Sequence, residues 1–176
     1  SDYCIQTDPA NWQQLSLGQK LRFKIRQIFM NRYEKRIFGT LSQTGLVHNP
    51  WTDVRTVVEN ASPYVSPNLG GGAILTVGSA LTEVASEACG VIAIGPFGCM
   101  PNRISESILS EVMTPGDKLG IPHREKYLET VLDGMESLPF LAVESDGSPF
   151  PQLIEAKLEA FCLRARRLHD RMRALN

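Results

Sequence analysis

The first part of the chain carries apolar residues at helical spacing. Between residues 17 and 36 they recur three or four positions apart, with basic residues largely between them. They are Leu17, Leu21, Ile25, Ile28 and Phe29. This spacing gathers the apolar side chains on one face and predicts an amphipathic helix.

Two more helices are expected before residue 90. Thr52 or Asp53 is positioned to cap a helix that runs through Val58 and stops by Pro63. A connector rich in proline and glycine follows, and then five apolar residues share a helical face. They are Ile74, Val77, Leu81, Val84 and Ala88, so the pattern predicts a helix that continues to Ala88. The three consecutive glycines 70–72 do not make a phosphate-binding loop, because no strand precedes them and no Gly-Lys-Ser/Thr follows.

Two short apolar runs predict the strands. The run 91–94, Val-Ile-Ala-Ile, is bounded by glycine and proline and is typical of a parallel strand that is buried on both faces. The run 139–143 follows a helix expected from about His123 to Glu136 and ends in a polar loop. A long helix with an apolar stripe from Ile154 to Met172 closes the chain. The fold class is therefore α/β, with a small parallel sheet flanked by helices.

Cys99 lies in a turn between the first strand and the next helix. Gly98 permits a positive φ beside it, Pro101 follows, and Asn102 is expected to be the N-cap of a helix that ends at Pro115-Gly116. Backbone N–H groups at a helix N-terminus stabilise an anion, so a thiolate at this place is favoured. A thiolate is a nucleophile and a soft metal ligand. The alternative is that Cys99 packs as a small buried hydrophobe.

The second strand ends close to an acidic residue, Asp146. Because the carboxyl ends of parallel strands open on one edge of a sheet, Cys99 and Asp146 are expected to face one crevice. The alternative is that Asp146-Gly147 is merely a turn.

The domain organisation follows from these elements. We expect a helical N-terminal extension over residues 1–60 and an α/β domain over residues 61–176. Two strands are few for an open α/β sheet, and the chain begins at Ser1 without an initiator Met, so it is expected to be a piece of a longer protein whose sheet is completed elsewhere. An unpaired strand edge would favour a homodimer.

Composition and charge exclude several classes of protein. The 18 basic and 19 acidic residues give a net charge of −1, which does not favour nucleic acid or an anionic membrane as a partner. Basic residues still cluster in the first helix and, as five arginines, in the last, and such runs are usually solvated helix faces. The sequence shows no pattern typical of a transmembrane segment or a secretory signal, and the four cysteines form no zinc-ligand or disulfide pattern. We therefore expect a cytoplasmic location with reduced thiols.

The motifs around both strands also carry a resemblance. The PFGCMP motif at residues 96–101, the LPFL run at 138–141 with Asp146-Gly147, and the EAKLEAF run at 155–161 resemble the C-terminal part of the 2-hydroxyacyl-CoA (2-hydroxyglutaryl-CoA) dehydratase and benzoyl-CoA reductase family. The likeness is greatest to its activase-related proteins and covers about residues 62–165.

The resemblance implies a Rossmann-like α/β domain of anaerobic metabolism. In such systems an ATP-driven activase passes an electron to an iron–sulfur enzyme that acts on acyl-CoA, and a cysteine at the place of Cys99 holds the cluster. Cys99 is the only position of this sequence that can be matched to a cluster-ligating cysteine of the family. Since a four-iron (4Fe-4S) cluster normally takes four thiolates, we expect the cluster only in the full-length parent, with no cofactor and no activity in this piece.

Two other functions remain open. The segment could be an assembly or docking domain that binds other domains of its parent or a partner subunit, with structural cysteines. It could also bind acyl-CoA, whose phosphates would be drawn to Arg103 or to the basic first helix.

Overall fold

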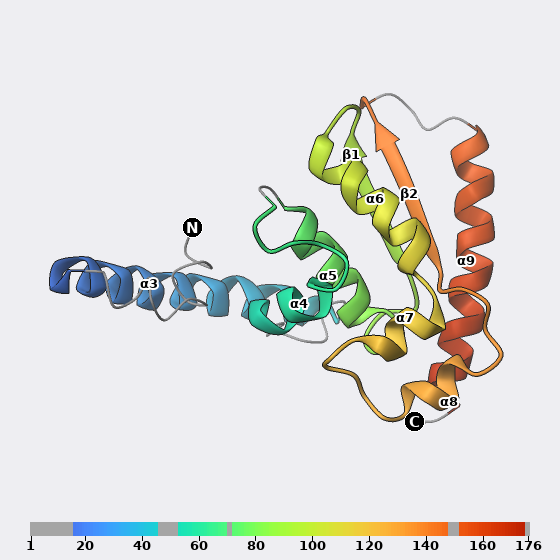
Figure 1. Cartoon of the computed structure of the whole chain (residues 1–176), viewed down its shortest axis with the longest axis horizontal. Coiled ribbons are helices and arrows are strands. Elements are labelled where there is room, and N and C mark those ends of the chain that lie inside the picture. Colours follow the sequence, from blue (N-terminus) through green and yellow to red (C-terminus); the bar gives the residue numbers. More distant parts are fainter. Residues whose placement is uncertain (1–15, 46–52, 70–71, 148–151, 175–176) are drawn as a thin grey trace. The chain divides into compact units, whose positions relative to one another are not determined.

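The computed structural model describes residues 16–45, 53–69, 72–147 and 152–174. The chain forms two compact units, Ser1–Thr52 and Asp53–Asn176 (Figure 1). The boundary thus falls at residue 52, and the expected division into a 1–60 extension and a 61–176 domain stays a prediction.

The first unit is described mainly by one long helix, α3 (Leu17–Leu41), and the short 3-10 turn η1 (Ser42–Thr44). A capping box starts α3: the Ser16 hydroxyl accepts from the Gln19 backbone N–H, and the Gln19 side chain accepts from the Ser16 N–H. The helix is longer than its sequence pattern indicates. None of its residues is buried, so its apolar face has no cover within the described part of this unit.

The second unit begins with two helices packed closely together, α4 (Val54–Ala61) and α5 (Ala73–Glu83). Asp53 is the N-cap of α4, since its side chain accepts from Arg55 N at 3.0 Å. Val57 of α4 lies directly against Gly78 of α5: a Cβ added at Gly78 would lie 2.6 Å from Val57 Cγ1. The glycine therefore sets the distance between these helices.

The helix α5 ends at Glu83, five residues before the predicted end at Ala88. Val84 is extended and Ala85 has a φ of 62°. The ammonium of Lys118, far along the chain, donates to Leu81 O at 2.7 Å and to Thr82 O at 2.8 Å. The ammonium thus takes the place of the backbone N–H groups that one more helical turn would have donated to these carbonyls. The prediction of a helix to Ala88 was wrong because a residue distant in the sequence provides these hydrogen bonds.

The described residues contain one sheet of two parallel strands, β1 (Val91–Pro96) and β2 (Phe140–Ser145). Val91 pairs with Phe140 and Pro96 with Ser145. Three helices connect the strands, α6 (Met100–Val112), α7 (Pro115–Gly120) and α8 (Leu128–Leu132), and α9 (Gln152–Arg173) follows β2 (Figure 1). The predicted mixed fold with a small parallel sheet is confirmed.

The prediction that the first strand is buried on both faces was wrong. Ala93 is buried, but Ile92 and Ile94 on the opposite face are 42% and 64% exposed. On that same face of β2, Leu141 and Val143 are buried, and α9 packs against this strand. On this face of the sheet, α9 therefore covers β2 and leaves β1 exposed to solvent.

The connection between the strands is less helical than expected. Instead of a helix from His123 to Glu136, α8 spans only Leu128–Leu132. The His123 backbone N–H donates to Asn60 Oδ1 at 3.1 Å, and the His123 ring lies 2.6 Å from Glu59 Oε2. These contacts hold the segment before α8 against α4. Pro115 also starts α7 rather than ending a helix, with Thr114 as the N-cap.

No helix in the described ranges is long and apolar enough to cross a membrane.

Candidate functional site

Cys99 is the N-cap residue of α6, directly after the end of β1. Its backbone N–H donates to Pro96 O at 3.3 Å, and its carbonyl accepts from Arg103 N at 3.0 Å. Gly98 has a φ of 71°, as the turn requires. The thiol makes no capping hydrogen bond, and the residue is half-buried.

Asn102 is not the N-cap, contrary to the sequence prediction. It lies in the first turn of α6, where Pro101 also fits because its missing N–H would be unpaired there. The Asn102 side chain lies over Gly95 of β1: a Cβ at Gly95 would be 2.6 Å from Asn102 Oδ1. Asn102 thus packs the helix against the strand instead of starting the helix.

Three large apolar residues near Cys99 in the sequence are exposed. Phe97 is 63% exposed and Met100 is 72% exposed, one on each side of the cysteine in the sequence. Ile94, which precedes them on β1, is 64% exposed. Large exposed apolar side chains are typical of a surface that another protein segment covers when they form a contiguous patch.

Arg103 is held by two carboxylates. Its Nε lies 2.6 Å from Glu144 Oε1 at the end of β2, and its Nη1 lies 3.4 Å from Glu106 Oε2 in the next turn of α6. The contact with Glu144 is an ion pair and not an aligned hydrogen bond, because the buried Oε1 has no hydrogen-bond partner. This ion pair ties α6 to β2 beside Cys99. The guanidinium proposed to attract CoA phosphates is thus already engaged by anions of this chain.

Asp146 comes directly after β2 and is exposed. The register pairs Pro96 with Ser145, so Cys99 and Asp146 both follow strand ends at one edge of the sheet. Asp146 also lies in a tight turn, in which Gly147 N donates to Ser145 Oγ at 3.0 Å and Gly147 has a φ of 89°. Both interpretations, a crevice residue and a turn residue, agree with this placement.

The ligand set that this chain offers to a metal cluster is small. The described cysteines, Cys89, Cys99 and Cys162, are all free. Within the described ranges, no group of three or more His, Cys, Asp or Glu side chains is arranged to hold a metal ion. Among the described cysteines, Cys99 is the one that lies in the motif singled out from the sequence.

The side chain of Lys118 is a buried cation that the sequence analysis did not single out. Lys118 is 1% exposed, and besides the two α5 carbonyls its ammonium donates to Ser86 Oγ at 3.2 Å. Burial lowers the pKa of Lys118 to about 8. A lysine in a six-residue helix is expected in solvent, and only the fold brings it to the end of α5.

No protein-family model, no curated protein and no solved structure matches this chain.

Proposed function

We propose that this chain is the C-terminal part of an iron–sulfur acyl-CoA dehydratase, reductase or activase-related protein, in which Cys99 is one ligand of the cluster. One observation carries the proposal. The PFGCMP motif presents a half-buried thiol at the N-terminus of a 13-residue helix, at the carboxyl edge of a parallel sheet, without using that thiol in the cap.

The chemistry of this place suits a thiolate ligand. The first N–H groups of α6 and the positive end of its dipole would favour a sulfur ligand that carries negative charge. A bound cluster would supply one-electron transfer. Cys99 would hold one iron, and the Arg103–Glu144 ion pair would fix the start of α6 relative to β2 and so keep the sulfur in place.

The exposed apolar residues on either side of Cys99 support a parent that covers them. A neighbouring domain seated on Ile94, Phe97 and Met100 would bring further thiolates and would exclude water from the cluster. In this proposal the sheet is Rossmann-like and is completed in the parent, and the parent works in an anaerobic cytoplasm. This 176-residue piece alone holds no stable cluster and has no dehydratase activity.

A second function, in a different class, is a docking domain without a cluster. The exposed apolar face of β1 favours it equally, since this surface would serve an assembly contact whether or not iron is bound. In this case Cys99 has no ligand.

Anaerobic iron and sulfide quantification on the full-length parent separates the two functions. The variants are Cys99→Ser and, as a matched control, Cys162→Ser, which removes an exposed thiol from α9. Serine is the better N-cap residue, so Cys99→Ser leaves α6 intact and tests ligation alone. Loss of cluster iron in Cys99→Ser but not in Cys162→Ser supports ligation. Unchanged iron in Cys99→Ser, or no iron in the parent, refutes it and leaves the docking domain.

A further inference from the structure

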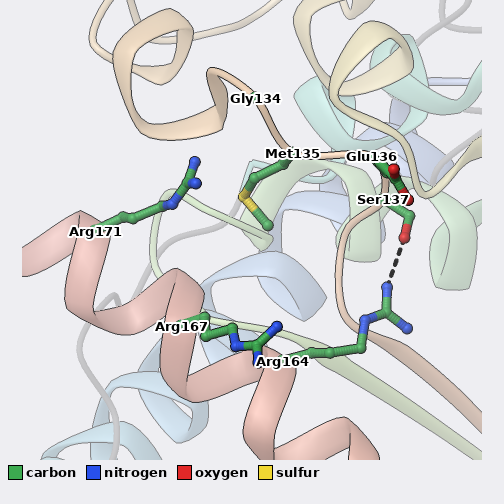
Figure 2. Close-up of a pocket in the computed structure, with 7 residues that line it drawn as sticks. All are labelled: Gly134, Met135, Glu136, Ser137, Arg164, Arg167 and Arg171. Carbon is green, nitrogen blue, oxygen red and sulfur yellow. Dashed lines mark hydrogen bonds between the residues drawn. The ribbon is translucent and has the colours of Figure 1, made fainter.

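A hollow lies between α9 and the loop that leads from α8 to β2. Its volume is about 300 Å³, and residues 134–137 form its wall on the loop side. Arg164, Arg167 and Arg171 form the other wall, at spacings of three and four residues along α9. Figure 2 shows Arg171 and Arg164 extending from α9 toward the loop, with Arg164 hydrogen-bonded to Ser137 and Arg167 between the two arginines.

Two of the arginines are anchored by neutral groups. Arg164 Nη2 donates to Ser137 Oγ at 2.8 Å and to Leu138 O at 3.0 Å. Arg171 Nη1 donates to Asp133 O at 2.6 Å and to Val131 O at 3.3 Å. These bonds hold both guanidiniums in position but do not neutralise them, because the acceptors are carbonyls and a hydroxyl.

Arg167 lies between the two anchored arginines on the same face of α9. Within the described part of the chain it makes no hydrogen bond or ion pair, and no carboxylate is ion-paired with any of the three guanidiniums. Glu136 is the one carboxylate among the lining residues, and it is exposed. The lining therefore has a formal charge of +2 in a chain whose net charge is −1.

The three arginines are exposed, as the sequence indicated for a solvated helix face, but they also line one hollow. Like charges at this spacing on a helix repel each other, so their convergence on one hollow costs stability unless an anion binds there. Guanidiniums bind phosphate oxygens through paired N–H groups, and positions fixed beforehand reduce the entropy lost on binding. A hollow of about 300 Å³ has the size of a small ligand-binding pocket.

We propose that this pocket binds the phosphate or diphosphate group of a small-molecule ligand. Arg167 binds the phosphate oxygens directly. Arg164 and Arg171 contribute positive charge and those guanidinium N–H groups that are not hydrogen-bonded to their protein acceptors. Gly134, with a φ of 67°, turns the loop so that its backbone passes alongside the arginines. The proposal does not depend on cluster ligation by Cys99.

The test is calorimetric titration of the full chain at low ionic strength with inorganic pyrophosphate and, separately, with ADP. We expect saturable binding of one anion per chain. Arg167→Gln should weaken it about tenfold or more, because a charge-assisted hydrogen bond contributes about 1.5–3 kcal/mol. Arg166→Gln is the matched control: it removes an exposed arginine of the same helix from outside the pocket and should leave the affinity unchanged.

The outcomes are distinguishable. Arg167 is exposed and makes no hydrogen bond or ion pair with the other residues that the structure describes, so thermal melting of Arg167→Gln should match the wild type. Tighter binding of ADP than of pyrophosphate would identify a nucleotide as the source of the phosphate, and the reverse would identify a free diphosphate. Absence of saturable binding by both anions, or equal weakening in Arg166→Gln and Arg167→Gln, would overturn the proposal.

Discussion

Replacing Gly78 by alanine tests how closely α4 and α5 pack. The added Cβ would lie 2.6 Å from Val57 Cγ1 and 2.8 Å from the Val57 carbonyl carbon. Ordinary van der Waals contact between carbon atoms needs about 3.5–4.0 Å, so one helix must move by about 1 Å. Backbone atoms are involved, and a change of side-chain rotamer cannot relieve the whole overlap.

The magnitude follows from two opposing contributions. Alanine in place of glycine inside a helix favours folding by about 1 kcal/mol. Overpacking of a closely packed contact costs about 1–3 kcal/mol, and the upper end applies here because Val57, Val58 and Ala61 of α4 are almost fully buried and lose contacts when α4 moves. We expect a net loss of about 2 kcal/mol in the free energy of unfolding.

Urea denaturation followed by far-ultraviolet circular dichroism measures this loss. Gly116→Ala is the matched control, because Gly116 also lies in a helix and a Cβ there would meet only Thr114 Oγ1 at 3.7 Å. The control should be neutral or stabilising by up to about 1 kcal/mol. If Gly78→Ala were as stable as Gly116→Ala, the close packing of α4 on α5 described above would be refuted.

Three further substitutions address other contacts. Burial lowers the pKa of Lys118 to about 8, whereas the ordinary pKa of lysine in the unfolded chain is 10.5. Between these two pH values the unfolded chain binds more protons than the folded chain, so the free energy of unfolding should rise with pH. Denaturation at several pH values should show this rise in the wild type but not in Lys118→Met. Desolvation and the hydrogen bond to Asp117 raise the pKa of Tyr64 to about 12. Between pH 10 and 12 the unfolded chain loses the phenol proton that the folded chain keeps, so the free energy of unfolding should fall with pH. Tyr64→Phe should lessen this fall, and an unchanged pH profile would contradict the role of the hydroxyl. A Cβ at Gly90 would lie 2.7 Å from Phe161 Cζ, so Gly90→Ala should cost about 1–3 kcal/mol and speed amide hydrogen exchange in α9, whereas unchanged exchange would show that the ring moves freely.

The sequence alone predicted those features that depend on neighbouring residues. Asp53 was one of two expected caps of α4, and the strand runs and the long last helix were found close to their observed bounds. The parallel arrangement of two strands also placed Cys99 and Asp146 at one edge. Periodicity, turn residues and chain direction are local properties, so they can be read without knowledge of the fold.

Contacts between distant residues decided the rest. Lys118 ends α5 from 37 residues away, and the contacts of His123 with Glu59 and Asn60 keep the segment before α8 out of a helix. Asn102 was expected to cap α6 but packs on Gly95, and the cap passes to Cys99. An apolar run such as 91–94 shows that a strand prefers burial but not which neighbour supplies it, so only the tertiary structure showed that Ile92 and Ile94 lie open. The arginines of α9 are exposed, as their pattern indicated. The pattern could not show the pocket that three of them line, because this pocket exists only where the loop 134–137 returns to α9.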